Sequence, residues 1–353
     1  MQALALVETL EHVCCRYRIR AFGPALRDAG VDLSIRGLGG GLIDRVAAIS
    51  AASHHETTIL QRKLLPGWQL ALLRHRAKCL VFDFDDAVLY RDSYDPRGVH
   101  CPRRARRFAA TVRAADLVLA GNPFLAQAAV DGGARPERVR VQPTVVDTTK
   151  YVIMSIHNPP VRLAWIGSSS TLQGIEQRRP LWERLGREVP GLTFRLICDR
   201  PAEFGPLAVE NVPWSEPDEA ADLAGADVGI ALVPDDLWSR GKCGLKVLQY
   251  QAAGLPVVAN PVGVQAMFVR HGVDGFLAET DDEWQRAVAT LAADPGLRAR
   301  MGAAGRASVQ RHASVAAWSE AFVGAALGAS TARSRPVPTA ARPMASAATG
   351  CQT

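Results

Sequence analysis

Short apolar runs alternate with longer amphipathic stretches through the first half of the chain. The runs lie at 3–7, 31–35, 57–61, 79–84, 117–120 and 138–142. Continuous apolar runs of this length are typical of strands buried in a parallel sheet. Helices are expected between them at 17–29, 66–77, 102–115 and 123–131. This alternation predicts a doubly wound α/β domain over residues 1–150.

The alternation starts again after a segment, 143–160, that contains three prolines and reads as a connection between domains. Strands are expected at 161–166, 192–198, 228–233, 256–259 and 275–278. The expected helices lie at 173–188, 242–253, 282–293 and 295–327, the last broken near Gln310. Residues 151–327 therefore form a second Rossmann-like domain. From 328 to 353 the sequence turns to Ala, Ser, Thr, Pro and Arg, which predicts a disordered tail.

A length of 353 residues suits two such domains, and 48% apolar residues can supply two cores. We see no apolar run of 18 residues, no secretion signal and no C-x-x-C pair among the seven cysteines. These features favour a cytoplasmic protein with reduced thiols. The formal charge of +6 suits an anionic ligand, an anionic membrane surface or nucleic acid, without choosing among them.

The most informative segment is SRGKCGLKVLQYQAAGLPVVAN, residues 239–260, which reads as loop, helix, glycine stop and buried strand. Gly241 and Gly244 permit close approach of the backbone where the helix begins, and free N–H groups there favour an anion. Lys242 and Lys246 are four residues apart, on one face of the expected helix. We interpret the segment as a diphosphate site, although solvated lysines beside a helix cap would give the same local pattern.

This segment resembles the donor-site signature of family 4 (group 1) glycosyltransferases, which have the GT-B fold of two Rossmann-like domains facing each other across a cleft. The resemblance extends through PVGVQ (261–265), HGVDGFLA (271–278) and RARMGAAGR (298–306). It implies that Gly241, Gly244, Leu245 and Gln249 contact the donor, with Lys242 and Lys246 stabilising its diphosphate. Gln249 stands where the family usually has the Glu that binds the ribose, and Gly241 replaces an earlier Glu.

A second donor contact is expected at Gly167, Ser168 and Ser169, in the segment WIGSSST of residues 165–171. There a strand runs into a Gly/Ser loop before a helix, the usual place for phosphate contacts in such a domain. Many members of the family have an Arg and a Lys in this region. Because this loop has neither, the expected stabilisation of the diphosphate depends more on Lys242 and Lys246.

Three carboxylates follow the strand at 79–84, in LVFDFDDAV. The carboxyl end of a strand faces the ligand crevice of an open α/β sheet. We therefore expect Asp85 to position an acceptor hydroxyl or stabilise an oxocarbenium ion, with Asp83 and Asp86 in support. Binding of Mg²⁺ or Mn²⁺ is an alternative, which the two-domain pattern disfavours, and helix capping is an equal alternative for Asp86.

Further cleft residues are expected where other strands end in the first half. Arg18 and Arg62 are candidates for binding a phosphate, and Asn122 for contacting the acceptor. The run RRARRF at 103–108 places four arginines on one helix. We interpret this run as a solvated face, with peripheral contact to an anionic membrane as the alternative.

These observations predict a glycosyltransferase that moves a hexose-type sugar from a nucleotide diphosphate sugar to a hydroxyl acceptor. The resemblance implies retention of configuration, no metal, no cofactor beyond the donor, and a part in cell-envelope or polysaccharide assembly. Nucleic acid is not an expected partner. The alternatives are a sugar-nucleotide epimerase or hydrolase on the same fold, and a non-catalytic nucleotide-sugar-binding subunit.

Overall fold

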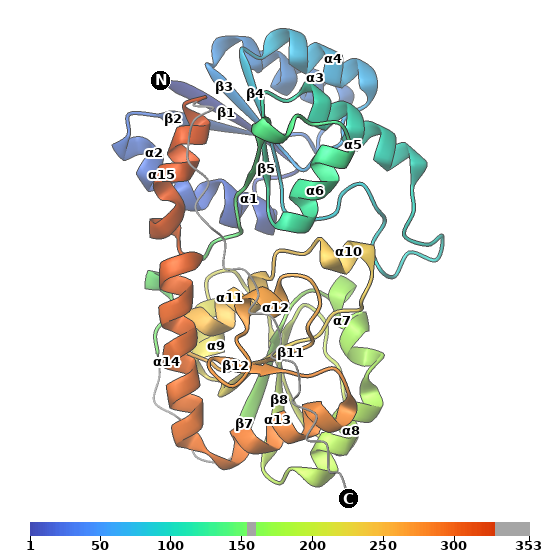
Figure 1. The fold of residues 1–353 in the computed structure, drawn as a ribbon, viewed down its shortest axis with the longest axis vertical. Helices are drawn as coiled ribbons and strands as arrows, with labels where there is room; N and C mark the ends of the chain where they lie inside the picture. The colour runs from blue at the N-terminus through green and yellow to red at the C-terminus, as the bar shows by residue number, and fades with distance from the viewer. Residues whose placement is uncertain (154–159, 329–353) are drawn as a thin grey trace, which may run out of the picture.

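The computed structural model describes residues 1–153 and 160–328, and these form two α/β domains, one above the other in Figure 1. Each domain is built on a parallel sheet of six strands, in the order β2-β1-β3-β4-β5-β6 and β12-β11-β10-β7-β8-β9. The predicted fold class is confirmed. The tail at 329–353 lies outside the described residues.

The strands of the N-terminal domain match the predicted apolar runs closely. They are β1 (Gln2–Val7), β2 (Asp32–Gly37), β3 (Thr57–Gln61), β4 (Cys79–Phe84), β5 (Leu117–Ala120) and β6 (Val139–Val141). The helices are α1 (Val13–Arg18), α2 (Gly23–Asp28), α3 (Leu42–Ser50), α4 (Gly67–Arg76), α5 (Pro102–Ala114) and α6 (Pro123–Asp131). Short 3-10 turns lie at Arg20–Phe22, Ala51–His54, Pro136–Arg138 and Thr148–Lys150.

The strands of the C-terminal domain are β7 (Val161–Ile166), β8 (Leu192–Cys198), β9 (Ala208–Pro213), β10 (Val228–Ala231), β11 (Val257–Ala259) and β12 (Gly275–Leu277). The helices that cover this sheet are α7 (Ser169–Glu176), α8 (Arg179–Glu188), α9 (Glu219–Ala224), α10 (Leu237–Arg240), α11 (Leu245–Ala252), α12 (Gln265–Phe268), α13 (Asp281–Ala293) and α14 (Pro295–His312). Figure 1 shows α14 along one side of this domain. Among the described helices, none is long and apolar enough to cross a membrane.

Two predicted helices are split by proline. The stretch 17–29 divides into α1 and α2, with Pro24 in the first turn of α2, and 173–188 divides into α7 and α8, with Pro180 in the first turn of α8. Proline lacks the N–H that a continuing helix needs, so it starts a new helix instead. Strand β9 is not predicted from the sequence. Its residues are half-buried or exposed because it is an edge strand, so they lack a continuous apolar run.

The last helix, α15 (Val315–Ala326), returns to the N-terminal domain, where Figure 1 shows it beside α2. The break before it, at Ala313 and Ser314, lies close to the predicted one near Gln310. Trp318 and Phe322 are buried in a cluster with β1, β3 and α2 of the N-terminal domain. The prediction that 151–327 form one unit is therefore wrong for α15, because its apolar face is covered by the other domain.

We predict that Phe322→Ala lowers the free energy of unfolding by about 3–5 kcal/mol, the usual cost of removing a buried aromatic ring. Phe322 is fully buried, and its ring stacks on Phe22 with a centroid distance of 4.2 Å. Urea denaturation measures the change. Val273→Ala is the control because Val273 is 49% exposed and should alter stability little. A loss for Phe322→Ala as small as that of the control would contradict the role given to α15.

Candidate active site between the two domains

Helix α11 begins at Leu245 because Gly244 precedes it in the left-handed conformation, with φ of 65°. A Cβ at residue 244 would also lie 2.9 Å from side-chain carbons of Val264 and Phe268, so both the turn and the packing require glycine. The expected helix start at Lys242 is corrected by this turn. The first N–H groups of α11 have no partner within the helix and favour an anion.

Lys246 lies in the first turn of α11 and borders the predicted Gly/Ser loop. Its Nζ is 4.5 Å from the centroid of the Trp165 ring and 3.4 Å from Thr171 Oγ1. A Cβ at Gly167 would come within 2.6 Å of the Trp165 ring and 2.9 Å of the same Nζ, and because the ring is buried, only glycine leaves room there. The structure therefore brings together the two segments that the sequence assigned to the donor.

Burial, and then the charge of Lys242, lower the pKa of Lys246 to about 7. Lys242 lies in the loop before α11, with its Nζ 5.5 Å from the Trp238 ring. Neither ammonium group forms an ion pair with a carboxylate in the described chain. An anion placed between them would favour the charged form of Lys246.

The Gly/Ser loop already binds a carboxylate of the protein, that of Asp199, which directly follows β8. Ser169 donates to Asp199 through its backbone N–H (2.6 Å) and through its hydroxyl (2.8 Å). These bonds lower the pKa of Asp199, so this carboxylate is ionised at neutral pH. Ser168 is exposed at the N-cap of α7, and Gly167 is half-buried. Ser169 is thus less available to a diphosphate than Gly167 and Ser168.

Gln249 is buried and faces the N-terminal domain. Its amide Nε2 donates to the Tyr17 hydroxyl at 2.9 Å, and Tyr17 donates to Glu219 Oε1 at 2.6 Å. Glu219 also accepts from Arg16 at 2.9 Å through its other oxygen. The two domains are therefore joined by a polar network that the sequence did not reveal. Its members are separated by about two hundred residues in the chain, and no local pattern links them.

A second interdomain contact is made by Asn122 at the start of α6. Its Oδ1 accepts from the N–H of Leu125 at 2.8 Å, which caps the helix. Its amide donates to the carbonyls of Gly241 and Lys242, both at 3.1 Å. Asn122 was predicted to contact an acceptor, but it is only 2% exposed and instead holds the donor-side loop.

The same loop inserts Cys243 into the apolar core of the N-terminal domain. A Cβ at Gly121 would lie 2.2 Å from Cys243 Sγ and 3.0 Å from the Cα of Asp85. Gly121 thus lies where the loop that contains Cys243 meets Asp85, the predicted catalytic carboxylate. This close approach brings Asp85 to the interface between the domains.

Arg18 and Asp83 form a buried ion pair within the N-terminal domain. The Arg18 Nε lies 3.1 and 2.9 Å from the two oxygens of Asp83, and its Nη1 donates to the carbonyl of Gln142 at 2.8 Å. Arg18 is 2% exposed and Asp83 is fully buried. The expectation that both side chains face the cleft is corrected, because each satisfies the other inside the core.

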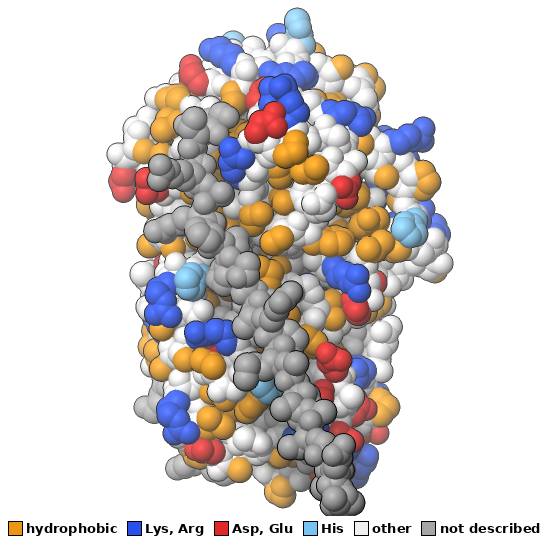
Figure 2. Space-filling view, viewed as in Figure 1, with side chains coloured by type: hydrophobic (Ala, Val, Ile, Leu, Met, Phe, Trp, Pro, Cys, Tyr) orange, Lys and Arg blue, Asp and Glu red, His pale blue; other side chains and the backbone are white. Residues whose placement is uncertain are grey.

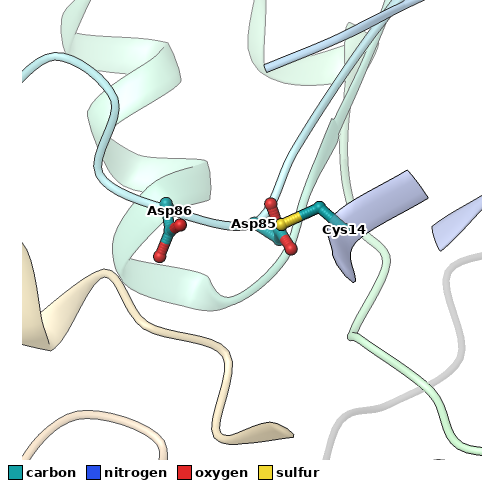
Figure 3. Close-up of side chains that lie close together, drawn as sticks. All are labelled: Cys14, Asp85 and Asp86. Carbon is teal, nitrogen blue, oxygen red and sulfur yellow. The ribbon is translucent and has the colours of Figure 1, made fainter. Parts of the chain in front are cut away.

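Asp85 and Asp86 lie close to Cys14 (Figure 3), and Arg62 pairs with both carboxylates. Arg62 Nη2 lies 2.8 Å from Asp86, and its Nη1 lies 3.8 Å from Asp85 Oδ1. Burial raises the pKa of Asp85, but Arg62 and Arg18 outweigh it, so the pKa lies below its usual value. Within the described chain, Asp85 Oδ1 is buried without a hydrogen-bond partner, which leaves it able to accept one.

The sulfur of Cys14 and the oxygens of Asp85 and Asp86 lie within 4.8 Å of one another, the spacing of a metal site. The guanidinium of Arg62 already neutralises this cluster and donates to Cys14 Sγ at 2.7 Å. Burial also raises the pKa of the Cys14 thiol well above its usual range, which disfavours the thiolate that a metal would need. These residues fit a divalent cation poorly.

Residues 177–324 match the family described as "Glycosyl transferase-like". The D-inositol 3-phosphate glycosyltransferase of Thermobispora bispora is 36% identical over 128 residues, 35% of this chain and 28% of that protein. The protein of the same name from Salinispora arenicola is 32% identical over 158 residues, 42% of this chain and 34% of that protein. The matched segments thus span about a third of each relative's length.

Solved structures resemble the chain over almost its whole length. Sucrose-phosphate synthase from Thermosynechococcus elongatus has a TM-score of 0.73 at 16% identity, covering 91% of this chain and 97% of that one. HepE of Anabaena in complex with UDP-glucose has a TM-score of 0.63 at 17% identity, covering 93% and 99%. Residues 177–324 are therefore a glycosyl transferase-like sequence, in a chain that has the two-domain fold of the GT-B glycosyltransferases.

Proposed function

We propose that this protein transfers a sugar from a nucleotide diphosphate sugar to a hydroxyl group of an acceptor. The observation that carries the proposal is the meeting of Lys246, the Gly167 loop and the first turn of α11, across the interface from Asp85. Two lysines without carboxylate partners and a helix N-terminus suit a diphosphate. The glycosyl transferase-like sequence of residues 177–324 supports the same assignment.

In this proposal the departing diphosphate is stabilised by Lys242, Lys246 and the free N–H groups of α11, so it needs no protonation to leave. Asp85, ionised beside Arg62, acts on the acceptor or the sugar ring instead of the diphosphate. Its Oδ1, which is 3.8 Å from Arg62 and has no hydrogen-bond partner in the described chain, accepts a hydrogen bond from the acceptor hydroxyl or stabilises positive charge on the sugar ring. The contacts of Asn122 and Cys243 keep the two sides together and exclude water.

The donor we favour is a UDP-activated hexose, because HepE, with a similar fold, was solved with UDP-glucose. We propose transfer with retention, without a metal, and onto a glycan, a lipid-linked or another hydroxyl acceptor. A cytoplasmic location, with peripheral contact to an anionic membrane as an alternative, belongs to the same proposal. The poor fit of Cys14, Asp85 and Asp86 to a divalent cation supports the metal-independent reaction.

A second candidate is a subunit that binds a nucleotide sugar without turning it over. It is favoured by Gly241 and Gln249, which stand where related enzymes usually have acidic residues. Gln249 is already engaged with Tyr17 in this structure. Turnover of the donor without an acceptor would instead favour an epimerase or a hydrolase.

The first prediction concerns donor binding. We expect saturation-transfer NMR against UDP, GDP, ADP and dTDP sugars to show selective binding to one nucleotide class. Lys242→Ala plus Lys246→Ala should weaken that binding about a hundredfold, because charge-assisted bonds to phosphate are lost. Lys150→Ala is the matched control, since Lys150 is exposed and lies outside this site. Failure of every nucleotide sugar to bind would refute the proposed function.

The second prediction concerns pH. The pKa of Lys246 is lowered to about 7 in the free protein, and a diphosphate would raise it. Binding should therefore be strongest below pH 7 and weaken, by up to about tenfold per pH unit, as the pH rises above 7. Isothermal titration calorimetry with the nucleotide sugar selected by NMR measures this. Lys246→Arg stays charged and should give a flatter profile; an equally steep one would contradict the assignment.

The third prediction separates two roles for Gln249. Tyr17 has one hydroxyl proton, and it is donated to Glu219, so a carboxylate at position 249 would lose the bond that Gln249 makes with Tyr17 and would add a second buried acid to the network that contains Glu219. Gln249→Glu should therefore lower the free energy of unfolding by about 1–3 kcal/mol, measured by urea denaturation. Adding Glu219→Gln frees the Tyr17 proton for the carboxylate introduced at position 249 and should recover part of the loss. Unchanged stability with higher turnover would mean that residue 249 serves the donor instead.

A further inference from the structure

The loop before α5 and the first turn of α5 enclose a cavity of about 480 Å³ outside the site described above. It is lined by Arg91, Arg97, Cys101, Pro102, Arg103, Arg104 and Arg106. Five of these seven residues are arginines and none is acidic. Figure 2 shows Lys and Arg side chains gathered over the part of the surface where Figure 1 draws α5. Such a concentration of one charge around a hollow attracts anions.

The position of these arginines is unfavourable for the free protein. Arg103, Arg104 and Arg106 lie in the first turn and a half of α5, which has no acidic residue in its first turn. The N-terminus of a helix carries a partial positive charge, so cations there are destabilising and anions are stabilising. The like charges also repel one another across the cavity. A bound anion would relieve both costs.

Part of the cluster is held in place by the protein itself. Arg91 donates to the carbonyls of Arg97 at 3.3 Å, of Gly98 at 3.0 Å and of His100. Asp95 pairs with Arg97 at 2.7 Å and lies 3.8 Å from Arg91, so one carboxylate offsets some of the charge behind the cavity. Arg104 donates to the carbonyl of Tyr90. These bonds fix the loop and orient the cationic wall.

The remaining two arginines are uncommitted. The side chains of Arg103 and Arg106 are exposed and form no hydrogen bond or ion pair in the part of the chain that the structure describes. Guanidinium groups match the geometry of phosphate oxygens, with paired N–H donors. The guanidinium groups of Arg103 and Arg106 are therefore suited to bind a phosphate from two sides, next to the arginines whose positions the protein already fixes.

We propose that this arginine pocket binds a phosphate group, carried either by a soluble phosphorylated molecule or by a phospholipid headgroup. The pocket is built from residues 91–106 alone and contains none of the residues assigned to the donor. The proposal therefore does not depend on the proposed transfer reaction. It replaces the interpretation of the 103–108 run as a merely solvated face.

Cys101 supplies an internal reporter because its thiol lines the pocket. The backbone N–H of Arg104, with Arg91 nearby, lowers the pKa of this thiol below its usual value, so it should react readily with iodoacetamide. A bound phosphate would shield the sulfur and disfavour its thiolate. Cys79 is also half-buried but lies on β4, outside the pocket, and reports any general change in reactivity.

The experiment follows alkylation of the full chain by peptide mass spectrometry, with and without inorganic pyrophosphate, and co-sedimentation with vesicles of phosphatidylglycerol or of phosphatidylcholine alone. We expect pyrophosphate to slow alkylation of Cys101 and not of Cys79, or phosphatidylglycerol vesicles to bind the protein. Protection without vesicle binding indicates a soluble ligand, and vesicle binding indicates a lipid headgroup. Both effects should weaken at high salt.

The decisive variant is Arg103→Ala plus Arg106→Ala, which removes the two uncommitted side chains and should weaken binding at least about tenfold. Arg76→Ala plus Arg187→Ala removes the same charge from exposed positions elsewhere and should change nothing. Donor binding by saturation-transfer NMR should be the same in both variants. Absence of protection and of vesicle binding, or equal binding by the two variants, would overturn the proposal.

Discussion

The arrangement of the site depends on the bond between Asn122 and the loop before α11, one of several contacts that join the two domains. The oxygen of Asn122 caps α6 in the N-terminal domain, and its amide holds the carbonyls of Gly241 and Lys242 in the other. Since Asn122 is buried, water cannot replace the hydrogen bonds of its oxygen or of its amide while the domains stay packed together. This bond sets the position of the loop that ends at Gly244, and therefore of Lys246 at the start of α11.

The packing of this loop explains why residue 241 is glycine, where the donor-site signature that the sequence resembles has a glutamate. A Cβ at residue 241 would lie 2.5 Å from the Cβ of Ala87 and 2.9 Å from its backbone nitrogen. A glutamate therefore cannot occupy this position while the loop is docked as it is here. Gln249 is explained in a similar way. Its amide donates to the hydroxyl oxygen of Tyr17, whereas a glutamate could not, and the only proton of that hydroxyl is already donated to Glu219. Both departures serve the closed interface between the domains.

Local sequence patterns were sufficient for most strands and for the place of the glycine-lysine segment before α11. The runs at 57–61, 79–84, 117–120, 161–166 and 192–198 coincide with β3, β4, β5, β7 and β8. Strands covered on both faces need continuous apolar runs, and such runs are visible in one sequence. Prediction was weaker where a single residue decides a boundary. Gly244 delays α11 by three residues, and Pro24 and Pro180 divide helices that periodicity alone would continue.

The sequence by itself determined two α/β domains, the glycine-lysine segment before α11 and the carboxylates after β4, because each depends on neighbours in the chain. Only the tertiary structure decided what these side chains contact. Arg18 and Asp83 neutralise each other inside the core, and Gln249 binds Tyr17 from the opposite domain. The physical reason is that a long polar side chain is placed by whichever partner satisfies its charge or hydrogen bonds when buried, and those partners are far away in the sequence.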